Sequence, residues 1–319
     1  MPSRSGPPRC CQISMARTEY GRSGMRSFVA LAALGALFIS TLAIGETPRT
    51  ALPAPVEGHE VTEIGPGYYT FRYKGLRNVF LITRSGVIVT DPIEPEAAAV
   101  LRAEIRKLTP LPVKYVVYSH QHWDHVRGGK IFAAEGATFV SHRNCLAHFK
   151  DLPEPEIVMP TRTFAGDRYV LRLGERKLEL RWLGINHGDC LVVMTPDHVN
   201  VPFIVDLGTA GGMPLPFIAD YSLHNWVRSL RELEGWSFEQ YVGGHGIALA
   251  PKSRLTERRE YLEALMTETR RELDAGTPLA QIPDVVAERL RERFAHLRGF
   301  SGIVRDNVRR TITYYGMGW

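Results

Sequence analysis

The 319-residue chain has too few cysteines to be held together by a disulfide framework. Of its four cysteines, Cys10 and Cys11 lie in an N-terminal segment that we expect to be removed, so Cys145 and Cys190 remain. The sequence leaves open whether these two form a disulfide or stay as unpaired buried thiols. The chain also lacks low-complexity runs and short repeats, which excludes fibrous and solenoid folds.

An excess of one charge sign is also missing once the N-terminal segment is set aside. The formal net charge of +5 rests on residues 1–45, which hold five arginines and a single acid, Glu19. The remainder has 34 basic and 33 acidic residues. A domain so close to neutral has no electrostatic footprint for nucleic acid, so we expect no nucleic-acid partner and disfavour a nuclease.

One long apolar run, Phe28 to Ile44, follows these arginines. Small residues at Ala43 and Gly45 then form a cleavage pattern before Glu46. This layout predicts a signal peptide over residues 1–45 and a periplasmic or secreted protein.

Two alternatives to a cleaved leader remain open. The apolar run is slightly long for a signal peptide and slightly short for a spanning helix, so residues 28–44 could instead anchor the protein in the inner membrane. A membrane contact is expected only through that segment. Met25, directly followed by Arg26, is a second candidate start, which would make residues 1–24 an extension of the gene model. The oligomeric state has no signal in the sequence.

The remaining pattern predicts a layered α/β domain, for which a hydrophobic content of 44% provides a sizeable core. We interpret residues 46–60, which contain three prolines, as a linker, residues 61–250 as the main domain and residues 251–319 as a helical extension. A helix with one apolar stripe is expected from Ala97 to Leu108. Further stripes predict helices after Arg254. Short apolar or alternating segments predict strands at 68–73, 79–82, 87–89, 113–118, 171–173, 178–182, 190–194 and 201–205.

The decisive segment is His120-Gln121-His122-Trp123-Asp124-His125, which directly follows one of these strands. It places four side chains of metal-ligand type within six positions. In an extended loop, His120 and His122 point the same way and can share one metal, whereas Asp124 and His125 can reach a second. Three protein ligands plus a water molecule is the usual arrangement of a catalytic zinc.

This segment resembles the H-x-H-x-D-H signature of the metallo-β-lactamase fold, and the resemblance extends over roughly Glu63 to Ala250. It implies a four-layer αββα sandwich, here with a C-terminal helical extension, and two zinc ions per chain, iron or manganese being alternatives. Asp91 matches the strand-terminal aspartate that supports the metal loop in this family.

The resemblance also supplies the remaining ligands. His187 matches the third imidazole of the first metal, and His245 matches the last ligand of the second metal. Asp206 matches the carboxylate that bridges both metals in the glyoxalase II and lactonase branches. Asp189 is a rival carboxylate because it lies two residues after His187, and a strand-end aspartate such as Asp206 can also simply cap a turn.

Departures from better-known branches narrow the expected function. Position 206 holds neither the cysteine nor the serine of true β-lactamases, so β-lactam hydrolysis becomes less favoured. Gln121 stands where flavodiiron oxygen reductases have glutamate. The C-terminal helices do not resemble the glutathione-binding domain of glyoxalase II.

The resemblance therefore implies an exported di-zinc hydrolase that cleaves an ester, lactone, thioester, amide or lactam bond of a small molecule with a metal-bridging hydroxide. Asp124 would orient this nucleophile and carry a proton. The alternatives are a mono-iron, persulfide dioxygenase-like or periplasmic redox-linked metalloprotein, a β-lactamase, and a metal-free binding module.

The walls of the pocket must select the substrate. We expect residues 208–217 and the pair Tyr68-Tyr69 to form its lip, although both also fit an ordinary surface loop and strand. Met213, Phe217 and Trp226 would make the pocket apolar if they face it.

Overall fold

The structure, a computed structural model, describes residues 58–209 and 211–318. The expected leader and most of the expected linker therefore lie outside the described residues. The first strand begins at His59, two residues before the domain start expected from the sequence. None of the described helices is both long and apolar enough to cross a membrane.

The first half of the domain forms a seven-stranded sheet in the order β1-β2-β3-β4-β5-β6-β7. Its first four strands are antiparallel neighbours, and β4 to β7 run parallel, with helical segments in the crossovers that follow β4, β5 and β6. The strands are β1 (His59–Gly65), β2 (Tyr68–Tyr73), β3 (Leu76–Thr83), β4 (Gly86–Thr90), β5 (Val113–Val117), β6 (Thr138–His142) and β7 (Arg162–Phe164). The connecting helices are α1 (Pro95–Leu108), α2 (Trp123–Val126), η1 (Arg127–Gly129), α3 (Lys130–Ala134) and α4 (Cys145–Asp151).

The second half forms a six-stranded sheet in the order β13-β12-β11-β10-β9-β8. Strands β11 and β12 are parallel and are joined through α5, whereas the other neighbours are antiparallel. The strands are β8 (Arg168–Leu173), β9 (Arg176–Trp182), β10 (Val192–Pro196), β11 (Phe203–Val205), β12 (Gln240–Gly243) and β13 (Ala250–Pro251). The helical segments are η2 (Asp206–Gly208), η3 (Pro216–Ile218) and α5 (Leu223–Glu234).

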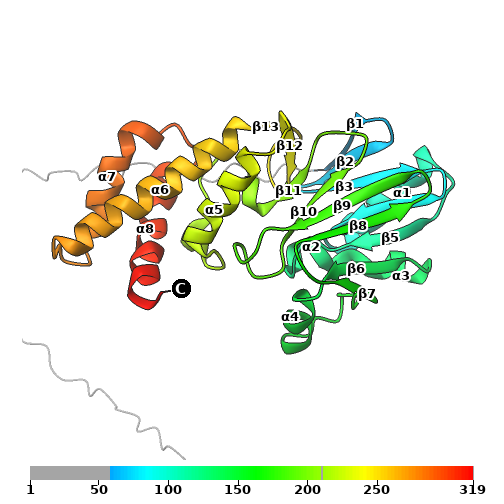
Figure 1. The fold of residues 1–319 in the computed structure, drawn as a ribbon, viewed down its shortest axis with the longest axis horizontal. Helices are drawn as coiled ribbons and strands as arrows, with labels where there is room; N and C mark the ends of the chain where they lie inside the picture. Colours follow the sequence, from blue (N-terminus) through cyan, green and yellow to red (C-terminus); the bar gives the residue numbers. More distant parts are fainter. Residues whose placement is uncertain (1–57, 210, 319) are drawn as a thin grey trace, which may run out of the picture. The chain divides into compact units, whose positions relative to one another are not determined.

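Three hydrophobic cores separate four layers. Ala97, Leu101 and Ile105 of α1 pack with Phe80 and Val89 on one face of the first sheet. Alternate side chains of β3, such as Val79 and Leu81, point from the opposite face of the first sheet and pack against residues of the second sheet such as Leu180 and Val192. Helix α5 covers the outer face of the second sheet. The expected αββα sandwich is confirmed, and Figure 1 shows its sheets beside one another.

Three further helices, α6 (Ser253–Asp274), α7 (Ile282–Phe294) and α8 (Phe300–Met317), extend the chain beyond α5. Figure 1 shows them grouped on the α5 side of the molecule, in yellow-orange to red. Their apolar side chains, including Leu262, Val286 and Val304, join those of α5 in a single core. The helical extension is therefore packed against the sandwich rather than set apart from it.

A disulfide joins Cys145 at the start of α4 to Cys190, just before β10. The two Cα atoms lie 5.3 Å apart. This bond answers the question that the sequence left open, and it fixes the loop before β10 to the helix that follows β6.

Candidate metal centre

The predicted ligands are brought together because parallel strands end at a common edge of each sheet. Parallel strands β4 and β5 end just before Asp91 and the 120–125 segment, and parallel strands β11 and β12 end just before Asp206 and His245. Ligand sites in open α/β sheets commonly lie at such carboxyl ends. His187 comes from the loop between β9 and β10, which faces the same edge.

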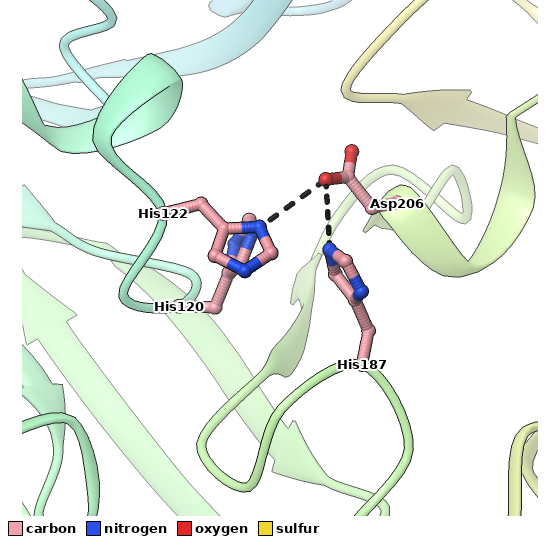
Figure 2. A group of neighbouring side chains, drawn as sticks. All are labelled: His120, His122, His187 and Asp206. Atoms are coloured by element: carbon pink, nitrogen blue, oxygen red, sulfur yellow. Dashed lines mark ion pairs between the residues drawn. The ribbon is translucent and has the colours of Figure 1, made fainter. Parts of the chain in front are cut away.

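All seven predicted ligands lie in two adjoining groups. One group is His120, His122, His187 and Asp206, and the other is Asp124, His125 and His245; within each group the donor atoms lie within 4.8 Å of one another. Figure 2 shows the first group, with Asp206 facing His120 and His187. The first group is mostly buried, whereas Asp124 in the second is exposed.

The distances between the candidate ligand atoms, within and between the two groups, fit metal ligation better than hydrogen bonding. Oδ2 of Asp206 lies 3.5 Å from Nε2 of His120 and 3.3 Å from Nε2 of both His125 and His187. Oδ1 of Asp206 lies 3.3 Å from Nε2 of His245. Two ligands on one tetrahedral zinc are about 3.4 Å apart, whereas charge-assisted hydrogen bonds are about 2.7–2.9 Å long.

Buried nitrogen atoms without hydrogen-bond partners point to the same interpretation. Nε2 of His120, both ring nitrogens of His125 and of His187, and Oδ1 of Asp206 have no hydrogen-bond partner among the described residues. Leaving so many buried polar atoms unsatisfied is costly unless another group binds them. The donor set of imidazoles and carboxylates suits a divalent transition metal, so the residues fit the expected ions.

The charge states suit metal binding as well. Burial lowers the pKa of both His120 and His187, which favours the neutral imidazole. Burial alone would raise the pKa of Asp206, but His125 and His245 outweigh it and hold the pKa well below its usual range. Neutral imidazole and ionised carboxylate are the forms that ligate metals.

Around His125 the centre is rich in acids. Burial alone would lower the pKa of His125, but Asp206, Asp91 and Asp124 outweigh it and raise the pKa well above its ordinary value. This part of the centre therefore favours a positive charge, which a metal ion supplies as well as a proton does.

Asp91 contacts the 119–125 segment, as the family resemblance implied. Its Oδ1 accepts a hydrogen bond from the backbone N–H of Ser119 at 2.7 Å, and its Oδ2 lies 3.6 Å from Nδ1 of His125. Ser119 Oγ in turn lies 2.8 Å from Nδ1 of His120. These contacts leave Nε2 of each histidine facing Asp206.

Asp220 performs a similar task for His122 and was not found from the sequence. Its Oδ2 lies 2.7 Å from Nε2 of His122, which leaves Nδ1 of that ring for a metal. Burial opposes ionisation of Asp220, but the hydrogen bond and charge of His122 lower its pKa overall. The residue follows η3 in a loop without a helical or strand pattern, so no local signal could have marked it.

Close packing of the backbone completes the centre. A Cβ atom on Gly244 would lie 2.7 Å from Oδ1 of Asp206 and 2.9 Å from Cε1 of His125, so only glycine fits there. Val205, directly before Asp206, has a φ of 50°, which is uncommon for a β-branched residue. Strain of this kind is often found where a strand end must direct a functional side chain.

The rival carboxylate lies outside the groups. Oδ1 of Asp189 is 2.7 Å from Nε2 of His148, on the exposed side of the loop. The structure thus places Asp206, and not Asp189, among the candidate ligands.

A cavity of about 930 Å³ adjoins the centre and includes Asp206 and His245 in its wall. Met213 and Trp226 line it, as does most of the loop at 209–216, in agreement with the expected lip. The expectation for Tyr68-Tyr69 is wrong: Tyr68 is buried between the sheets, and Tyr69 stacks on Phe80 within the first sheet. Phe217 is 53% exposed and is not part of the cavity wall.

The sequence and the fold both match known proteins of one class. Residues 72–144 match the sequence family described as the metallo-beta-lactamase superfamily. The fold is similar to a metallo-beta-lactamase from Pontibacter korlensis, with a TM-score of 0.58 and 22% identity over 65% of this chain and 99% of that one. DIM-1 metallo-beta-lactamase gives a TM-score of 0.57 and 17% identity over 66% of this chain and 98% of that one. The chain therefore has the metallo-β-lactamase fold and carries the histidine-rich segment of that superfamily.

Two further relatives differ in length and activity. A double mutant of the sec-alkyl sulfatase PisA1 has a TM-score of 0.63 and 15% identity, over 80% of this chain and 50% of that one. The 2,4-dinitroanisole O-demethylase subunit alpha of Nocardioides sp. (strain JS1661) is 24% identical over 163 residues. That match spans half of this chain and about half of the relative's length.

Proposed function

We propose that this protein is an exported hydrolase that uses two zinc ions to cleave an ester, lactone, thioester, amide or lactam bond of a small molecule. The observation that carries the proposal is the set of six ligand-to-ligand distances of 3.3–3.6 Å among six of the seven predicted ligands, which come from distant parts of the chain. When bound, two zinc ions supply Lewis acidity and make water a nucleophile near neutral pH.

The ligands divide between two positions. His120, His122 and His187 would hold the first ion, and Asp124, His125 and His245 the second. Asp206 would serve both, because its Oδ2 faces His120 and His187 while its Oδ1 faces His245.

Asp124 is the residue best placed to move protons. Its side chain is 47% exposed, and its Oδ2 lies 3.4 Å from His125 and 3.6 Å from His245. A carboxylate that borders both the centre and solvent can orient an attacking water and pass its proton outward.

Export is supported by two independent features. The N-terminal pattern of arginines followed by an apolar run is typical of a secretory leader. The Cys145–Cys190 disulfide is of a kind that persists in oxidising compartments such as the periplasm.

The curated relative adds one more bond type to be tested. Its name describes removal of a methyl group from the oxygen of an electron-poor aromatic ether. An attacking water at the centre would suit such an activated ring, so 2,4-dinitroanisole belongs in the substrate panel.

The test is metal analysis of the purified protein together with turnover of chromogenic ester, lactone, thioester, cephalosporin and 2,4-dinitroanisole substrates. We expect two zinc ions per chain and turnover of at least one substrate. His148→Ala is a matched control, because His148 lies outside both groups. One iron per chain would favour the redox alternative, and bound zinc with every substrate inert would contradict the hydrolase proposal.

A further inference from the structure

We propose that the cavity beside the metal centre binds an amphiphile with one negatively charged head group, and that Arg258 of α6 recognises that charge. The inference rests on the proposed function, because it places the reacting bond of this substrate near Asp206 and His245. It assigns a role to the C-terminal helical extension, in which none of the seven predicted metal ligands lies.

One cavity connects the metal centre with the extension. Asp206 and His245 form part of its wall, and residues of α6, of the α7–α8 connection and of the start of α8 form another part. Its volume of about 930 Å³ is at the upper end of the range typical of sites for drug-sized molecules. A substrate bound there can contact the centre and the extension at once.

The wall is both apolar and basic. Five arginine or lysine side chains line the cavity, and Asp206 is the only carboxylate among the described residues that do so. Arg72 and Arg77 pair with Glu60, and Lys74 pairs with Glu94, so Arg258 and Arg298 are the basic residues of the wall that have no ion pair among the described residues. The large apolar side chains of the wall include Met213, Leu215, Trp226, Ile247, Phe300 and Ile303.

Arg258 stands out among the basic residues because it is buried without an anion. It is 5% exposed, and its Nη2 donates hydrogen bonds to the carbonyl oxygens of Thr209 and Gly212 at 2.9 and 2.7 Å. Its Nε and Nη1 have no hydrogen-bond partner among the described residues. Holding the 209–212 loop therefore accounts for only one of its three nitrogen atoms.

The other arginines of α6 provide an internal comparison. All four form ion pairs with carboxylates, whereas Arg258 forms none within the described parts of the chain. These four are Arg254, Arg259, Arg270 and Arg271. An unpaired buried guanidinium is costly, and arginine does not escape the cost by losing its proton. A ligand's anionic group would supply the missing partner, with which a planar guanidinium can form two parallel hydrogen bonds.

The entrance of the cavity favours an apolar chain behind that head group. Leu215 is 66% exposed and Ile247 is 49% exposed, although both are large apolar side chains in the cavity wall. Arg298, also in the wall, is exposed and has no ion pair among the described residues. A ligand with a charged end and an apolar body would satisfy both features together.

The test is calorimetric titration of the full-length protein with decanol, decanoate, decyl sulfate, decyl phosphate and decyltrimethylammonium. Each titration is done on the protein as purified and again after removal of metal with a chelator, so that binding does not depend on the metal centre. We expect at least one anionic probe to bind about tenfold to a hundredfold more tightly than decanol, as loss of a charged hydrogen bond implies. The cation should bind most weakly, and the three anions distinguish a carboxylate from a sulfate or a phosphate head group.

Arg258→Met should remove this preference for anions, so that the anionic probes bind to the variant no more tightly than decanol does. Arg259→Met is the matched control: its partners are Glu234 and Glu263 and it is outside the cavity wall, so all affinities should stay as in the parent protein. If Arg258→Met does not fold, Arg258→Lys should keep part of the preference, and Arg298→Met, at an exposed position, should weaken anion binding about twofold to fivefold.

Three outcomes would overturn the inference: equal binding of decanol and all anions, no binding of any probe, or an undiminished anion preference in a folded Arg258→Met protein. Any of these would leave the hydrolase proposal intact, because turnover of a small neutral ester tests that proposal separately.

Discussion

The two groups of ligands differ in how much of the protein surrounds them. His120, His187 and Asp206 of the first group are buried, and His122 is held by Asp220. In the second group only His125 is buried, while the side chains of Asp124 and His245 are 47% and 27% exposed. A buried, pre-oriented position loses little order when an ion binds, so we expect the first ion to be held more tightly than the second.

The largest effect is expected where the two groups meet. Asp206→Asn removes a carboxylate that faces both groups, so both metal positions should weaken and the zinc content should fall. Activity should decrease by at least the same proportion. Elemental analysis measures this, with Asp189→Asn as the control, because Asp189 pairs with His148, outside both groups. A variant that kept two zinc ions would show that Asp206 is not shared.

Replacing one histidine in each group should separate the two positions. We expect His245→Ala to keep one zinc ion, because the first group stays intact. His187→Ala should lose the tighter ion, because the first group then keeps only three of its four residues. Titration of each variant and of the parent protein with a zinc chelator measures the order of release. Release of both ions from the parent at one chelator concentration would contradict the difference between the groups.

Gly244→Ala should affect mainly the second position. The new methyl group would press on Oδ1 of Asp206 and on the ring of His125, at an expected cost of about 1–3 kcal/mol. In the chelator titration, the second, more weakly held ion should be released at a lower chelator concentration than in the parent protein. Gly302→Ala is the control, since nothing lies within 4 Å of a Cβ atom at that helical position. Unchanged release of the second ion in Gly244→Ala would mean that the centre is less closely packed than described.

Asp220→Asn should affect only the first position. It weakens the hydrogen bond that orients His122 but leaves every ligand in place, so zinc affinity should fall about tenfold to a hundredfold. The chelator concentration that releases the first, more tightly held ion should fall, whereas the concentration that releases the second ion should not change. The opposite pattern would show that His122 contributes to the second position.

Much of this centre could be predicted because its ligands follow buried strands. The strand before Ser119 and the dense 120–125 segment identified one part of the centre, and the family resemblance supplied His187, Asp206 and His245. The αββα layers followed from the family resemblance and are present in the described residues. Local sequence patterns report such features because strand, turn and side-chain type lie within a few residues of one another.

Residues that act through long-range packing could not be predicted. Asp220 reaches His122 only because residues 186–188 and 220–222 lie side by side, joined by backbone hydrogen bonds. Arg258 lies on the apolar stripe of α6 between Leu255 and Leu262, so helical spacing indicates its burial, but its contacts depend on where the loop at 209–212 lies. Tyr68 alternates as a surface strand would, yet its face is covered by the second sheet.

The disulfide has a consequence for how the protein matures. Cys145 and Cys190 enclose 44 residues in a covalent ring, and His187 lies inside it, whereas the 120–125 segment lies outside. Until the two thiols are oxidised, the loop that carries His187 is free of this tether, so full metal loading should follow oxidation rather than precede it. Preparations made in a reducing cytoplasm should therefore contain under-metallated molecules, which zinc added after oxidation would complete.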